Sequence, residues 1–238
     1  MFTYSPAWPH GPVTAAFPDV FHVVGTNKTH HAGVDLQTSR TMTVLRDGGA
    51  LTLINTVRLD DAGLHALEAL GEVRHVVRLG AFHGRDDPFY CDRYGAALWA
   101  LPGALHADGR ATARTLVAGG PFPVADGEVF VFASARFPEA AVLLAREGGI
   151  LITCDAIQNW TAVDAFFSPS CGELFVTQGL IRAANVPATW LAACAPDPDD
   201  FRRLLAHPFR HLISAHGEPL RDEAHARSAA RVAEVFPA

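Results

Sequence analysis

The sequence of 238 residues is long enough for one large domain or two small ones, and its 49% hydrophobic and 18% charged residues are typical of a folded globular protein. Its formal net charge of −6, with no cluster of lysine and arginine, argues against nucleic-acid binding. No apolar run approaches the roughly 20 residues that a membrane span needs, so we expect no membrane partner.

The amino-terminal residues 1–13 lack a basic segment followed by an apolar one, so we expect no secretory signal. The cysteines lie far apart and form no CxxC pair; they are Cys91, Cys154, Cys171 and Cys194. This spacing indicates reduced, mostly buried thiols in a cytoplasmic protein rather than a disulfide framework or a zinc knuckle.

The first predicted elements alternate strands with helices. Residues 41–57 predict two strands joined by a turn that contains two glycines, and residues 59–71 predict a helix with a leucine face between an aspartate cap and a terminal glycine. A strand over 73–79 leads to a short helix over 86–95, which has a proline in its first turn, and then to a strand over 97–103.

The second half predicts further strands around a helical connection over 158–206 that several prolines interrupt. These strands cover 112–119, 127–135, both arms of a hairpin over 140–155, and 209–217. A helix over 220–236 follows. This order favours an α/β architecture of two mixed sheets with helices on the outside, in one domain over residues 1–238.

Three of the predicted strands end in side chains that can bind metal. His83, Asp86 and Asp87 follow the strand over 73–79, Asp155 ends the hairpin, and His216 ends the last strand. Side chains at the carboxyl ends of neighbouring strands converge on one rim of a sheet. Imidazole and carboxylate together suit zinc, iron or manganese, whereas the lack of clustered thiolates argues against a closed structural zinc site.

Each candidate also has a structural interpretation. Asp87 precedes a proline, which is an ordinary helix start in which the aspartate caps free amides. His83 could be a partly buried histidine bonded to the backbone, and Asp155 could cap the turn that follows it. His216 is the strongest candidate, because the glycine after it lets the chain turn tightly.

His30 and His31 form a second histidine cluster, in the polar stretch TNKTHHAG. Adjacent residues on an extended backbone point in opposite directions, so at most one of them could face a site. We expect a surface loop here.

The order of these segments resembles the metallo-β-lactamase fold over roughly residues 40–220. The resemblance implies an αββα sandwich: two mixed sheets face to face, helices on the outer faces, and a metal site at one edge. Members of that superfamily carry an HxHxDH motif after the strand that corresponds to 73–79. In this chain the sequence FHGRDD keeps only part of it: His83 stands for a histidine, Asp86 or Asp87 for the aspartate, and Ala81 or Phe82 for the first histidine.

The resemblance also covers the later ligands. Asp155 in LITCD matches the aspartate that ends a strand, and His216 in SAHG matches the final histidine. Arg136 stands where a mid-chain histidine is expected. The chain is therefore similar to a divergent branch of the superfamily with an incomplete ligand set.

The missing ligands imply that the site holds one metal ion rather than two. This ion would be zinc, iron or manganese. The ligands would be His83, an acid from Asp86 and Asp87, Asp155 and His216. An ion with an open position lowers the pKa of water, and Asp87 or Asp155 could act as general base in the hydrolysis of an ester, thioester, amide or phosphoester.

Arg136 adds the hypothesis that the small-molecule substrate is anionic, because a fixed guanidinium repels a second cation and binds carboxylate or phosphate. The alternative is a degenerate, non-catalytic protein that keeps the sandwich and binds a small anionic ligand or a protein partner. The substrate and the oligomeric state stay open.

Overall fold

Two mixed β-sheets form the centre of the structure, a computed structural model that describes residues 3–31 and 33–237. The strands described in the larger sheet are, in spatial order, β1 (Thr14–Phe17), β2 (Val20–His31), β3 (Val34–Asp47), β4 (Ala50–Ile54), β5 (Glu72–Arg78), β6 (Ala97–Ala100) and β7 (Arg114–Thr115). Neighbours from β1 to β4 run antiparallel, and those from β4 to β7 run parallel.

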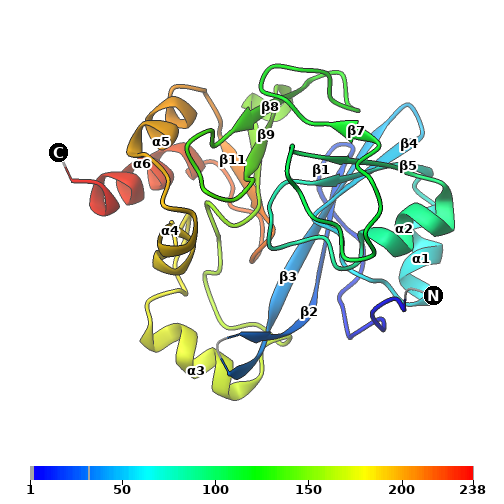
Figure 1. Cartoon of the computed structure of the whole chain (residues 1–238), viewed down its shortest axis with the longest axis horizontal. Coiled ribbons are helices and arrows are strands. Elements are labelled where there is room, and N and C mark those ends of the chain that lie inside the picture. Colours follow the sequence, from blue (N-terminus) through cyan, green and yellow to red (C-terminus); the bar gives the residue numbers. More distant parts are fainter. Residues whose placement is uncertain (1–2, 32, 238) are drawn as a thin grey trace.

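The smaller sheet packs against the larger one (Figure 1). Its strands are, in spatial order, β11 (His211–Ser214), β10 (Ile150–Thr153), β9 (Ala140–Leu144) and β8 (Gly127–Val131). β10 and β11 run parallel, whereas β9 runs antiparallel to both β8 and β10. A short 3₁₀ turn, η1 (Arg146–Gly148), joins β9 to β10.

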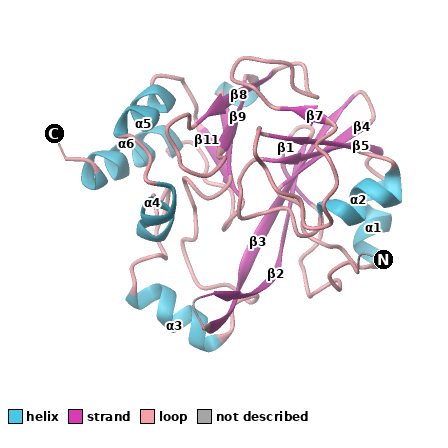
Figure 2. Cartoon of the chain, viewed as in Figure 1, coloured by secondary structure: helices cyan, strands magenta, loops and turns pink. Residues whose placement is uncertain are grey.

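Helices cover both outer faces, as Figure 2 shows. α1 (Asp61–Glu68) and α2 (Asp87–Tyr94) lie on the larger sheet. α4 (Ala188–Cys194), α5 (Pro198–Leu205) and α6 (Ala224–Val235) lie on the smaller sheet. α3 (Pro169–Thr177) packs against β3, toward the far end of the long β2–β3 ribbon. Among the described residues, no helix combines the length and the apolar character that crossing a membrane requires.

The apolar core lies in three layers, which explains why the strands of the smaller sheet read as continuous apolar runs. Ile150 and Ile152 of β10 face the larger sheet, whereas Leu151 faces the helices. Successive side chains of a strand point to opposite faces, so a strand buried on both faces needs apolar residues throughout. Fully burying one such side chain stabilises the fold by about 1.5–3 kcal/mol. The predicted αββα sandwich of two mixed sheets is confirmed.

The helix α1 has the aspartate cap and the leucine face that the sequence predicts. The Asp60 side chain accepts a hydrogen bond of 2.8 Å from the Gly63 amide, and Leu64 and Leu67 are buried against the larger sheet. Asp60, and not Asp61, is thus the cap. Such a cap contributes about 1 kcal/mol.

The main difference from the sequence prediction lies in residues 20–40. His30 and His31 belong to β2, which pairs with β3 up to Val34, and not to the expected surface loop. His30 Nδ1 lies 2.8 Å from Asp35 Oδ1 across this ribbon. The exposed half of this ribbon carries polar residues on both faces. Its sequence therefore lacks the alternation of polar and apolar residues by which strands are recognised.

Backbone hydrogen bonds tie the two sheets together at one edge. The Ala140 amide donates to Leu79 O at 2.8 Å, and the Ala81 amide donates to Pro138 O at 2.9 Å. The Thr41 amide donates to Ala215 O at 2.7 Å, which joins β3 to the end of β11. This edge therefore holds the ends of β5, β10 and β11 close together.

Candidate metal centre

Three of the predicted site residues meet at this edge. His83 Nε2 lies 3.1 Å from His216 Nε2 and 3.3 Å from Asp155 Oδ2, and His216 Nε2 lies 2.9 Å from Asp155 Oδ1. His83 comes from the loop after β5, Asp155 from the turn after β10, and His216 from the turn after β11. The structure thus brings together residues that are up to 133 positions apart in the chain.

No arrangement of protons makes all three contacts favourable. If both Nε2 atoms carry a proton and donate to Asp155, the contact between His83 and His216 sets two donors against each other. If one Nε2 loses its proton, its lone pair faces a carboxylate oxygen. A cation bound by all three atoms removes this conflict, because every atom then acts as an electron-pair donor.

The triangle also has a suitable size. Tetrahedral zinc with bonds of about 2.0–2.1 Å places its ligand atoms about 3.3–3.4 Å apart. The observed edges of 2.9, 3.1 and 3.3 Å are close to that spacing. The donor set of two imidazoles and one carboxylate therefore fits zinc, and it also suits iron or manganese.

Burial decides the charge of the ligand atoms. His83, Asp155 and His216 are only 7%, 8% and 6% exposed. Burial lowers the pKa of His83 to about 4, so its imidazole is neutral near pH 7 and keeps a lone pair for a metal. Burial opposes ionisation of Asp155, but the His83 and His216 imidazoles outweigh it and hold the pKa of that carboxyl well below its usual range.

His216 is held by packing and by the backbone. Its amide donates to Ser214 Oγ at 3.2 Å, and its ring packs against Trp160 with 4.4 Å between the ring centroids. Gly217 has a φ of +86°, and a Cβ there would lie 2.0 Å from Asn159 O. The structure thus supports the reason given for His216 from the sequence, namely that a glycine is needed in this turn.

Glu139 is a buried acid of the site that the sequence analysis missed. Its Oε1 accepts hydrogen bonds of 2.8 Å from the amides of both Asp155 and Ala156. Burial, and then the nearby Asp155 charge, raise the pKa of Glu139 well above its usual range and so favour its protonated form. In the sequence, Glu139 stands directly before the apolar strand AAVLL. An acid at such a position is more often a surface residue, so the sequence alone does not indicate its role.

Cys154 is the second residue that was missed. Its Sγ belongs with a nitrogen of His83 and an oxygen of Asp155 to a group of atoms within 4.8 Å of one another. Burial raises the pKa of this thiol well above its usual range, so it is a neutral core residue unless a metal displaces the proton. Its position beside Asp155 in LITCD was the signal.

One oxygen of Asp86 and one of Asp87 have other partners, and the second oxygen of each is buried without a partner among the described residues. Asp86 Oδ2 lies 2.6 Å from Arg40 Nη2, and Asp87 Oδ1 accepts a hydrogen bond of 2.6 Å from Thr56 Oγ1. Asp87 is the first residue of α2 and not its cap, and burial raises the pKa of its carboxyl. Metal binding by either acid stays a prediction.

Arg136 lies in the loop between β8 and β9. Its backbone amide donates to Cys194 O at 2.7 Å, and its side chain is exposed, in contrast to the three ligand candidates. Substrate binding by Arg136 likewise stays a prediction.

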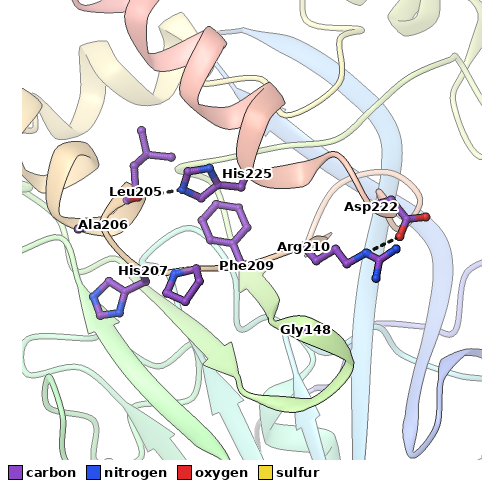
Figure 3. A pocket seen from close by; sticks show the side chains of 9 residues that line it. Gly148, Leu205, Ala206, His207, Phe209, Arg210, Asp222 and His225 are labelled. Atoms are coloured by element: carbon purple, nitrogen blue, oxygen red, sulfur yellow. Dashed lines mark hydrogen bonds and ion pairs between the residues drawn. The ribbon is translucent and has the colours of Figure 1, made fainter.

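A surface depression of about 460 Å³ lies near the start of β11, away from the end that carries His216 (Figure 3). Several of the polar groups that line it have partners within the protein: Arg210 Nε contacts Asp222 at 2.7 Å, and His225 Nε2 lies 2.9 Å from Leu205 O. His83, Asp155 and His216 do not line this depression.

Solved metallo-β-lactamases share this architecture. A structure of DIM-1 exposed to ceftazidime matches with a TM-score of 0.61 at 13% identity, over 94% of this chain and 97% of that chain. FIM-1 from Pseudomonas aeruginosa, in its mono-zinc form, matches with a TM-score of 0.60 at 16% identity, over 97% and 98%. A metallo-β-lactamase from Erythrobacter litoralis matches with a TM-score of 0.58 at 16% identity, over 93% and 92%.

No protein-family model matches the chain, and no curated protein sequence does. The chain is a divergent protein with the metallo-β-lactamase fold, as the partial motif predicted. At these identities the likeness shows the fold alone.

Proposed function

We propose that this protein is a metal-dependent hydrolase-like protein that holds one ion through His83, Asp155 and His216. The observation that carries the proposal is the buried triangle of Nε2, Nε2 and carboxylate oxygen atoms, which protons alone cannot satisfy. The mono-zinc form of the similar FIM-1 supports a single ion in this fold. Zinc is the first candidate, with iron or manganese as alternatives.

When bound, such an ion supplies Lewis acidity toward water and toward a carbonyl or phosphoryl oxygen. Both Asp155 oxygens contact imidazoles, whereas Asp87 Oδ2 has no partner among the described residues. Of the two predicted bases, Asp87 therefore keeps a buried oxygen that is free to accept a proton. Its raised pKa makes it the stronger base of the pair.

The proposed substrate is a small molecule with an ester, thioester, amide or phosphoester bond. An anionic group on it would pair with the exposed guanidinium of Arg136. We also propose a cytoplasmic location, without a nucleic-acid or membrane partner. Residues 1–238 would form one domain.

A second candidate is a non-catalytic protein that binds a small anionic ligand or a protein partner. The burial of all three ligand candidates favours it, because side chains that are 6–8% exposed leave little surface for a substrate. Activity measurements on metal-loaded protein separate the two candidates.

The first experiment measures bound metal in protein purified without a histidine tag, by plasma mass spectrometry. We expect about one equivalent in the wild type and its loss in His216→Ala and in Asp155→Ala. His30→Ala is the matched control, because it removes an exposed histidine outside the centre, and it should keep the metal. The proposal fails if the wild type binds no metal even after incubation with excess zinc or manganese.

A further inference from the structure

A buried arginine lies beside the metal centre. Arg40 is in the middle of β3 and is only 5% exposed. A guanidinium stays charged at any physiological pH, so its burial requires a partner of opposite charge.

The partner of Arg40 is Asp86, one of the acids predicted to bind metal. Arg40 Nη2 lies 2.6 Å from Asp86 Oδ2 and also donates to the carbonyl oxygen of Thr56. The Arg58 amide donates to the same Asp86 oxygen at 3.1 Å. Asp86 thus serves as counter-ion to a fixed cation and as an acceptor for a loop amide.

Arg40 also lies close to the ligand candidates. The amide of its neighbour Thr41 donates to Ala215 O at 2.7 Å, and Thr41 Oγ1 donates to Gly217 O at 2.8 Å, so this part of β3 contacts the turn that carries His216. Asp86, the partner of Arg40, follows His83 by three residues and directly precedes α2. A positive charge therefore lies beside the loop that joins His83 to α2.

Other arginines nearby do not replace it. Arg78 is buried under the His83 loop, where it donates to the carbonyl oxygens of Gly80, Ala81 and Leu105. Arg85 points elsewhere and donates to Lys28 O at 2.7 Å.

We infer that the guanidinium of Arg40 takes the place of a second metal ion in this centre. It neutralises Asp86 and limits the site to one metal ion. This inference rests on the proposed function. A second divalent ion would have to displace a buried guanidinium from its carboxylate, or lie next to an uncompensated like charge, and both are unfavourable in a poorly solvated site. Asp86 then stabilises the centre through Arg40 and does not bind the metal.

A single and a double variant test this role. The proteins are the wild type, Asp86→Asn and Asp86→Asn/Arg40→Met, with zinc affinity measured by chelator competition and stoichiometry by native mass spectrometry. Asp86→Asn leaves Arg40 uncompensated, so we expect zinc binding at least about tenfold weaker. The double variant removes both charges and should bind one ion with an affinity within about threefold of the wild type.

The outcomes separate this inference from the proposed function. One zinc ion in the wild type and recovery in the double variant support the role of Arg40. Two zinc ions in the wild type, or a double variant as weak as Asp86→Asn, overturn it, because Asp86 would then be a ligand. If Asp86→Asn does not fold, comparison of the double variant with the wild type still decides. A wild type that binds no zinc contradicts the proposed function itself.

Discussion

At the scale of single residues, two neighbouring acids at the metal centre have pKa values that are shifted in opposite directions. The two imidazoles that contact Asp155 lower its pKa and favour its ionised form, whereas burial raises the pKa of Glu139, which accepts backbone amides, and favours its protonated form. A proton on Glu139 avoids a second buried negative charge next to Asp155. Glu139 therefore positions the turn that carries Asp155 without adding charge to the site.

Glu139 should make the stability of the metal-free protein depend on pH. The folded state keeps the Glu139 proton above the ordinary pKa of 4.5, where the unfolded chain has lost it, so this residue lowers stability as pH rises. Relative to Glu139→Gln, the wild type should lose up to about 1.4 kcal/mol per pH unit above pH 5. Urea unfolding at pH 5, 6.5 and 8 in the presence of a chelator measures this difference. A difference that grows in the opposite direction would contradict the protonated state.

At the scale of elements, the ends of β10 and β11 decide where the ligands point. The two strands run parallel in register from Ile150 and His211, so Asp155 and His216 leave the sheet at the same edge. Ser214 Oγ donates to Ile157 O at 2.8 Å and joins the two turns. The Asn159 amide donates to His216 O at 2.9 Å and closes the same contact.

Gly217→Ala should disrupt this contact between the turns. The new Cβ would meet the Asn159 backbone at a positive φ, so we expect a loss of at least about 3 kcal/mol in stability and weaker metal binding. Gly48→Ala in the β3–β4 turn is the matched control: its φ is +55°, but no atom lies within 4 Å of the added Cβ. The control should cost only about 1 kcal/mol in urea unfolding. Equal losses of stability in the two variants would show that contact between the added Cβ and the Asn159 backbone is unimportant.

At the scale of the whole molecule, the metal centre lies where two sheets and several loops meet. His83 follows a strand of the larger sheet, whereas Asp155 and His216 follow strands of the smaller one. An ion bound to all three would link the two halves of the sandwich. Binding to the folded state alone must therefore stabilise the whole fold.

Removal of the metal should lower the melting temperature. At a free metal concentration of about 1,000 times Kd, binding contributes about 4 kcal/mol, which corresponds to roughly 8–16 °C for a chain of this size. Scanning calorimetry with and without a chelator measures the shift. His216→Ala should melt at the same temperature in both conditions, and a chelator effect of equal size in this variant would place the metal elsewhere.

The fold could be predicted from the sequence to a large extent because its signals are local. The aspartate cap of α1, the glycine turn between β3 and β4, and the apolar runs of β9 and β10 each lie within a few residues. The long β2–β3 ribbon could not be predicted, because polar residues such as His30 and Asp35 satisfy each other across the pair and not along the chain.

For the site, the sequence by itself determined the candidates at three strand ends, and His83, Asp155 and His216 do lie together. Only the tertiary structure decided the rest: Arg40 holds Asp86, Thr56 binds Asp87, and Glu139 supports the turn of Asp155. The physical reason is that a charge in a buried site depends on partners that are distant in sequence. Asp86 and Asp87 carry the same side chain next to each other, and only the folded chain gives one of them an arginine.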